Sequence, residues 1–287
     1  MILITGATGN LGLAVVDQLL KITSTDQFSV LARNETKAEF LKEKGIEVRI
    51  GDFDDSSSLE NAFTNIDKLL LISTMEQNRF EQHKNVVDAA VKAGVKHIIY
   101  TGLAIKDIET SGVKDLMISH FQTENYIKGK GLLYTFLRNT MYADAIPLIA
   151  GEEIFERGIS LPGGNGKVPY ALRREMGEAT ANLLLQEGHE NKTYDITGSK
   201  AYSYQDIVIG LNAITGKEVH YTDVDANTFL SILKDAGVPD FPIYLLSGTV
   251  ADIRNHQYEI EDNTLELLLG RPTTTLIEFL KEIYHLD

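Results

Sequence analysis

Short apolar runs alternate with stretches of helical spacing along the first half of the chain. The runs are typical of strands that are buried on both faces of a parallel sheet. Between them, apolar residues return at helical intervals, as in Leu11, Val15, Val16 and Leu19, which predicts amphipathic helices. The predicted strands are 2–4, 28–32, 46–50, 68–74, 96–101 and 132–138, and the predicted helices are 11–20, 36–44, a short one capped by Ser56, 80–94 and 115–128.

This order of six strands alternating with five helices specifies an α/β fold with a parallel sheet. Because crossovers between parallel strands are right-handed, we expect the sheet to be doubly wound, as in a Rossmann fold. Neither an internal repeat nor a low-complexity linker interrupts the alternation.

The pattern changes beyond Asn139, where proline and glycine residues break it up. We expect residues 1–140 to form the sheet domain. Residues 141–287 are expected to form a smaller, mostly helical C-terminal α/β lobe that covers its cleft and returns some chain to the sheet. The helices predicted in this lobe are 173–186, 204–214, 226–236, 264–269 and 275–284, and the strands are 193–196 and 219–224.

Three glycines with regular spacing, Gly6, Gly9 and Gly12, follow the first predicted strand. Between a strand and a helix, this spacing is typical of dinucleotide binding: the first glycine permits a sharp turn, the second lets the backbone approach a pyrophosphate, and the third lets the helix pack close to the strand. The N-terminus of the helix then holds the phosphates. The alternative is an ordinary glycine turn. The segment expected to bind the dinucleotide consists of Gly6, Ala7, Thr8, Gly9, Asn10, Leu11 and Gly12.

Arg33 follows the second predicted strand, where the residue at the strand end meets the adenosine ribose. An acidic residue there would hydrogen-bond the free 2′-hydroxyl of NAD(H), whereas a guanidinium pairs with a 2′-phosphate. Arg33 therefore favours NADP(H) as the cofactor. We accordingly expect residues 1–140 to form an NAD(P)-binding domain. The alternative is a solvated arginine that begins the next helix.

The carboxyl ends of the third and fourth predicted strands supply further candidates. In a doubly wound sheet, ligands lie outside the carboxyl ends of the strands near the switch in strand order. We therefore expect Ser73, Thr74 and Met75 beside the nicotinamide half of the cofactor. Asp52 is expected to flank the adenine ring, and a turn carboxylate before the next helix is an equally good interpretation of it.

The composition is that of an acidic globular protein. With 43% hydrophobic residues in 287, the chain can fill a sizeable core. Its 27 Lys and Arg against 41 Asp and Glu give a net charge of −14, which argues against a nucleic-acid or anionic-membrane partner. The absence of cysteine excludes a disulfide framework, a thiolate metal site and a thiol nucleophile, and we expect no metal.

Targeting segments are not predicted. No apolar run approaches the roughly 18 residues that a membrane span needs. Met1 opens directly into the first predicted strand without a charged leader, so we expect a cytoplasmic protein with no membrane partner. The sequence leaves the oligomeric state open, a homo-oligomer included.

The combined motifs resemble the NmrA-like branch of the atypical short-chain dehydrogenase/reductases, nearly from end to end. The resemblance implies an NADPH-preferring reductase of small quinones. It places residues 6–11, Arg33, residues 73–75 and Lys167 on the cofactor, with Asn139 and Tyr142 facing nicotinamide and substrate. The motifs that support it are Gly6 to Gly12, Arg33-Asn34, Asp52, Leu70-Leu71-Ile72-Ser73, Gly94-Val95-Lys96, His120, Leu137-Arg138-Asn139, Gly164-Asn165-Gly166-Lys167 and Arg271-Pro272-Thr273-Thr274-Thr275-Leu276.

The catalytic pair of the wider superfamily, Tyr-x-x-x-Lys on the helix after strand five, has no match at the expected place. Aligned on Glu124, this chain has His120 at the lysine position and Leu116 at the tyrosine position. A Tyr-x-x-x-Lys string does occur at Tyr126 and Lys130, but it straddles the glycines that end the helix. We interpret that string as a surface helix end.

Reduction of a quinone would not need the missing acid, because its product, a hydroquinone anion, is far less basic than an alkoxide. His120 is then a candidate catalytic residue as donor, proton shuttle or ribose ligand, or else a capped histidine on the helix surface. Tyr142 is a candidate for stacking on the substrate ring, or else a core aromatic residue. Gly102 stands where quinone reductases of this family have serine, which leaves one substrate hydrogen bond in question.

Two other functions stay open. One is a redox-sensing regulator, because NmrA-type proteins bind NADP(H) and a protein partner with little turnover. An epimerase or carbonyl reductase is disfavoured by the missing tyrosine and lysine.

Overall fold

The computed structural model describes residues 1–151 and 153–286. The chain divides into two compact units, and each unit takes separate stretches of the sequence. The first unit consists of Met1–Leu103, Ile118–Asn139 and Arg173–Ile196, and the second consists of Ala104–Met117, Thr140–Leu172 and the chain from Thr197 onward. The domain boundary expected at residue 140 stays a prediction.

A seven-stranded sheet forms the middle of the first unit, with the order β3-β2-β1-β4-β5-β6-β8. All six pairings between neighbours are parallel. The order runs outward from β1 to β3 and then outward again from β4 to β8, so the switch in direction lies between β1 and β4. The doubly wound α/β fold predicted from the sequence is confirmed. The strands are β1 (Ile2–Ile4), β2 (Phe28–Ala32), β3 (Glu47–Ile50), β4 (Lys68–Leu71), β5 (His97–Leu103), β6 (Leu133–Asn139) and β8 (Lys192–Ile196).

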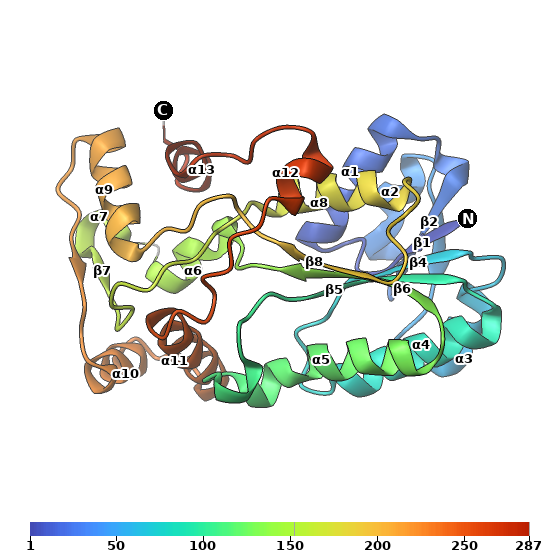
Figure 1. Cartoon of the computed structure of the whole chain (residues 1–287), viewed down its shortest axis with the longest axis horizontal. Coiled ribbons are helices and arrows are strands. Elements are labelled where there is room, and N and C mark those ends of the chain that lie inside the picture. Colours follow the sequence, from blue (N-terminus) through green and yellow to red (C-terminus); the bar gives the residue numbers. More distant parts are fainter. Residues whose placement is uncertain (152, 287) are drawn as a thin grey trace. The chain divides into compact units, whose positions relative to one another are not determined.

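Helices cover both faces of this sheet, with α1 and α8 on one face and α3, α4 and α5 on the other (Figure 1). On the second face, Val86, Val87 and Ile127 pack with the strand residues Ile98 and Phe136 in one buried cluster. Burial of each such side chain stabilises the fold by about 1.5–3 kcal/mol. The helices of this unit are α1 (Asn10–Ile22), α2 (Glu39–Glu43), α3 (Ser56–Ala62), α4 (Arg79–Ala93), α5 (Lys114–Gly129), which begins in the second unit, and α8 (Arg173–Leu184).

One helix cap differs from the prediction. Ser56 is the first residue of α3, and the cap is Asp55, whose carboxylate accepts from Ser57 N at 3.0 Å and Ser58 N at 3.3 Å. The backbone of Asp55 is extended, which lets its side chain reach back to these unpaired first-turn amides. The prediction of Ser56 as the cap was wrong by one residue.

The second unit is mostly helical, and its two-stranded sheet pairs β7 with β9 in parallel. Sequence patterning missed α11, because Pro239 and Pro242 resemble helix breakers. Proline is tolerated in a first turn, where its missing N–H would have no intrahelical partner. The elements of this unit are α6 (Ile146–Ala150), α7 (Ile154–Arg157), β7 (Ile159–Ser160), α9 (Tyr204–Thr215), β9 (Tyr221–Thr222), α10 (Ala226–Asp235), α11 (Asp240–Arg254), α12 (Thr264–Leu269) and α13 (Leu276–Ile283).

Within the described residues, no helix combines the length and the apolar character that a membrane-crossing segment needs.

Candidate active site

The glycine turn after β1 is held open by close backbone contacts. Gly6 has a φ of +63°, in the left-handed region that favours glycine. A Cβ on Gly12 would lie 2.1 Å from the Gly6 carbonyl oxygen, so only glycine fits there. Gly9 caps α1 without any side-chain hydrogen bond, and its own N–H donates to Gly6 O at 2.9 Å.

The N-terminus of α1 fits an anionic ligand. The first amides of a helix have no intrahelical partner, and the first turn of α1 contains no acidic residue. Thr8, Gly9 and Asn10 are exposed, whereas Ala7 and Leu11 are buried. Ala7 and Leu11 can therefore meet a bound phosphate only through their backbone.

Arg33 lies directly after β2, at the same edge of the sheet as the glycine turn. The register pairs Ile4 of β1 with Val30 of β2, so the two strands end side by side. Arg33 is exposed and has no hydrogen-bond or ion-pair partner among the described residues. An unpaired guanidinium beside a helix N-terminus is a chemical match for a phosphate group.

Asp52 stabilises the turn after β3. Its Oδ1 accepts from Asp54 N at 3.0 Å, and its own N–H donates to Ser58 Oγ at 2.9 Å. The side chain is half-buried. The turn role is therefore present in the structure, and the contact with an adenine ring stays a prediction.

The segment after β4, residues 73–75, is fixed by side chains from neighbouring elements. Ser73 N donates to Thr101 Oγ1 of β5 at 2.9 Å. Arg79, the first residue of α4, donates through Nε to Thr74 O at 2.5 Å and through Nη2 to Met75 Sδ at 3.7 Å. Met75 itself is 55% exposed. These contacts hold the segment at the carboxyl edge next to the switch point.

His120 is buried against β5 and is not a histidine on the helix surface. Its Nδ1 lies 2.8 Å from the hydroxyl oxygen of Tyr100, and the two residues are 6% and 0% exposed. Burial, followed by the charges of Arg79 and His83, lowers the pKa of His120 well below its ordinary value. Burial also raises the pKa of Tyr100. The phenol is therefore protonated and the imidazole neutral at neutral pH.

Arg79 and His83 extend this buried polar group along α4. Arg79 is fully buried and donates through Nη1 to Ser119 Oγ at 2.8 Å. His83 Nδ1 lies 3.0 Å from Thr123 Oγ1, and the Thr123 hydroxyl donates to Ser119 O at 2.8 Å. Burial lowers the pKa of His83 to about 3.

Sequence patterning did not select Arg79, His83 or Tyr100. A signal was present, because His83 stands four residues before Val87 on the helix face that is otherwise apolar. A polar residue on a buried stripe is a reason to expect a buried polar group.

Gly102 lies against a buried ion pair. Glu124 is 2% exposed and accepts from Arg138 Nε at 2.9 Å and from Arg138 Nη2 at 2.6 Å. A Cβ on Gly102 would lie 3.2 Å from Glu124 Oε1. The carboxylate therefore takes up the space beside residue 102, and a larger residue there would crowd it.

Tyr126 and Lys130 lie at the far end of α5. The Tyr126 hydroxyl donates to Asp88 Oδ1 at 2.8 Å, and Lys130 Nζ lies 2.7 Å from the same oxygen. Because α5 runs back from the carboxyl end of β5 to the start of β6, its last turns lie toward the amino edge of the sheet. This position favours the interpretation of Tyr126 and Lys130 as a helix end.

The remaining predicted residues lie where β6 ends and in the second unit. Asn139 is the last residue of β6 and is 5% exposed. Tyr142 and Lys167 belong to the second unit, where Tyr142 forms a bridge with Ala171. Their predicted places beside a cofactor or substrate stay predictions.

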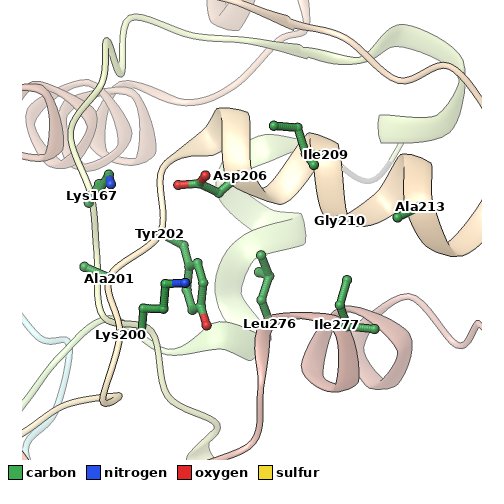
Figure 2. Close-up of a pocket in the computed structure, with 10 residues that line it drawn as sticks. All are labelled: Lys167, Lys200, Ala201, Tyr202, Asp206, Ile209, Gly210, Ala213, Leu276 and Ile277. Atoms are coloured by element: carbon green, nitrogen blue, oxygen red, sulfur yellow. The ribbon is translucent and has the colours of Figure 1, made fainter.

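Lys167 lines a pocket of about 340 Å³ within the second unit. Figure 2 shows the side chains of Lys200 and Tyr202 in this pocket, with Asp206 on α9. The Lys200 Nζ lies 5.6 Å from the centroid of the Tyr202 ring, and Leu276 supplies an apolar wall.

Comparison with known proteins identifies the family. The model of the NmrA-like family matches residues 1–270. The chain belongs to the NmrA-like family. Among its relatives, Quinone oxidoreductase 2 of Escherichia coli is 35% identical over 289 residues, which cover 100% of both chains. NAD(P)H azoreductase of Xenophilus azovorans is 26% identical over 292 residues and covers 98% of this chain and 97% of its own.

Solved structures of the family have the same fold. The NADPH-dependent quinone oxidoreductase of Escherichia coli in complex with NADPH matches with a TM-score of 0.91 at 34% identity, over 99% of this chain and 100% of its own. The triphenylmethane reductase of Citrobacter in complex with NADP(H) matches with a TM-score of 0.90 at 34% identity, with the same coverage.

Proposed function

We propose that this NmrA-like NAD(P)H oxidoreductase uses NADPH to reduce small quinones. The observation that supports it most directly is the position of Arg33, exposed and without a protein partner, at the strand end next to the open N-terminus of α1. Relatives with about a third of their residues identical are named for quinone reduction and were crystallised with NADPH.

The cofactor site of the proposal uses residues of the first unit. The amides of Thr8 and residues 10–12 would hold the pyrophosphate, and Arg33 would pair with the 2′-phosphate. Asp52 would flank the adenine, and residues 73–75 would lie along the nicotinamide half. The family resemblance adds Asn139 and Lys167 to the residues expected on the cofactor. Bound NADPH would supply a hydride from C4 of its nicotinamide.

The substrate class follows from the proton requirement. A quinone that accepts a hydride becomes a hydroquinone anion, which takes one proton from water to give the hydroquinone. Leu116 stands where the superfamily has its tyrosine acid, so this chain suits a substrate that needs no strong acid. His120 would donate a hydrogen bond to the reacting oxygen, and Tyr142 would orient the ring.

The test is multiple-turnover oxidation of NADPH by purified protein with a benzoquinone, followed by the nicotinamide absorbance after subtraction of the non-enzymatic rate. We expect steady oxidation with NADPH and slower oxidation with NADH at equal concentration. NADPH binding without turnover would contradict the enzymatic proposal and favour a redox-sensing regulator. Equal rates with the two cofactors would contradict the assignment of Arg33.

A further inference from the structure

The hydrogen bond between Tyr100 and His120 determines where the imidazole has its proton. The Tyr100 hydroxyl lies 2.8 Å from His120 Nδ1, and its second hydrogen-bonding neighbour is the Thr123 hydroxyl. Thr123 already donates to Ser119 O and lies 3.0 Å from His83 Nδ1, so it is a weaker acceptor for the phenol hydrogen than the unshared imidazole nitrogen. The phenol therefore donates to Nδ1. A neutral imidazole that accepts at Nδ1 has its hydrogen on Nε2.

The surroundings keep this imidazole neutral. The guanidinium of Arg79 is fixed by Ser119 Oγ and Thr74 O, and its charge acts on the ring in the same direction as burial, which is the larger effect. His83 adds to this effect. The carboxylate of Glu124, on the next turn of α5, is bound by Arg138 on both oxygens.

Nε2 is the ring nitrogen that remains for a ligand. No described residue forms a hydrogen bond with it. Tyr100 is followed in β5 by Thr101, whose Oγ1 accepts from Ser73 N at 2.9 Å. Tyr100 itself pairs with Leu71, the last residue of β4, and lies three residues before β5 ends. The pair of Tyr100 and His120 is therefore close to the carboxyl end of β4, next to the switch point near which doubly wound sheets bind their ligands.

We propose that Tyr100 is a positioning residue that fixes His120 as the Nε2–H tautomer, and that this N–H is a neutral hydrogen-bond donor to the substrate oxygen. The donor role rests on the proposed quinone reduction, whereas the tautomer does not. Charge that develops on the oxygen during hydride transfer is stabilised by a fixed N–H dipole. His120 keeps its proton, because a neutral imidazole is a poor acid, and the proton of the hydroquinone comes from water.

The direct test is nitrogen NMR of protein labelled at its histidine rings, with His120→Gln used to assign the His120 signals. We expect the wild-type ring to show an unprotonated Nδ1 and a protonated Nε2 from mildly acidic to mildly alkaline pH. Tyr100→Phe should give a mixture of tautomers. A protonated Nδ1 in the wild type, or a tautomer unchanged in Tyr100→Phe, would overturn the proposal.

Tyr134→Phe is a matched control, because Tyr134 lies on the neighbouring strand β6, stacks on Phe136, and has no hydrogen bond from its hydroxyl to a described residue. It should leave the His120 signals unchanged.

Kinetics test the donor role separately. Tyr100→Phe should lower kcat for a benzoquinone by a factor of roughly ten, below the ~10²–10⁴ of a general acid, with the KM for NADPH unchanged. An unchanged kcat together with a mixed tautomer would overturn the donor role. Absence of turnover in the wild type would overturn the proposed function and the donor role with it, while the NMR result would still decide the tautomer.

Discussion

Arg138 binds both carboxylate oxygens of the buried Glu124, at 2.9 Å and 2.6 Å. The side chain of Glu124 is 3% exposed and that of Arg138 is 29% exposed, so the buried carboxylate depends on this partner for its hydrogen bonds. Hydrogen bonding to Glu124 in turn raises the pKa of Arg138. The pair joins α5 to β6 beside Gly102 and so fixes the helix that contains His120.

Loss of one partner of this pair should cost much more stability than loss of both. Arg138→Met should lower the free energy of unfolding by about 3–5 kcal/mol, because it leaves a buried carboxylate without its cation. The double variant Glu124→Gln with Arg138→Met should lose clearly less. Denaturant unfolding measures both values. Equal losses in the single and double variants would mean that Glu124 is not dependent on Arg138.

Arg33→Ala should weaken NADPH binding by about 1.5–3 kcal/mol and spare NADH, because only NADPH has a 2′-phosphate for the guanidinium. Isothermal titration with each cofactor measures the change. Lys37→Ala is a matched control, since Lys37 is also exposed and lies four residues further along the chain, in a short 3₁₀ helix. An equal loss of affinity for the two cofactors would exclude a contact between Arg33 and the 2′-phosphate.

Gly9→Val should abolish binding of both dinucleotides and preserve the fold. The backbone of Gly9 is extended, with φ −89° and ψ 166°, and an added Cβ would meet only Gly6 O at 3.3 Å. The added side chain would instead occupy the space that a pyrophosphate approaches. Cofactor titration together with a thermal melt separates the two effects. Gly129→Ala, in open space, should alter neither; unchanged affinity in Gly9→Val would remove the glycine turn from the site.

His120→Ala should reduce quinone turnover by less than the roughly 10²–10⁴-fold of a general acid, because the proton comes from water. A simple ketone should be a very poor substrate, since its alkoxide needs an acid. Tyr126→Phe should have no effect on either rate. Efficient ketone reduction, or an inactive Tyr126→Phe protein that still folds and binds NADPH, would mean that Tyr126 and Lys130 form a displaced catalytic pair.

His83 should make stability depend on pH below neutrality. Its pKa is about 3 in the folded protein and near 6.5 in the unfolded chain, so between these values the unfolded state binds more protons. The free energy of unfolding should therefore fall as the pH drops from 6.5 toward 3, by up to about 1.4 kcal/mol per pH unit from this residue. The pKa of His120 is lowered too, so His120 adds to the fall.

His83→Asn should make this fall less steep, as measured by denaturant midpoints across the acidic range. His220→Asn, at an exposed position, is the control and should leave the slope unchanged. Parallel curves for His83→Asn and wild type would show that His83 takes up a proton in the folded state.

The sequence alone determined the features that depend on local spacing. The alternation of strands and helices and the glycine turn were predicted, because a period of two or 3.6 residues and a glycine spacing are properties of a few adjacent positions. Arg33 follows the second strand as expected, and its contact with a 2′-phosphate stays a prediction. Gly12 was expected to let the helix pack close to the strand. The structure has this close packing, because an added Cβ on Gly12 would lie 2.1 Å from Gly6 O.

Only the tertiary structure decided which polar residues are buried and what they contact. Tyr100, His83 and Arg79 lie on different elements or turns, and nothing in their local sequence shows that α4, α5 and β5 enclose them together. The same limit explains why His120 could be interpreted as a surface residue, whereas α11 was missed because its prolines resemble helix breakers. Burial, pKa and the tautomer of an imidazole depend on neighbours that are distant in sequence, so they are fixed only when the chain has packed.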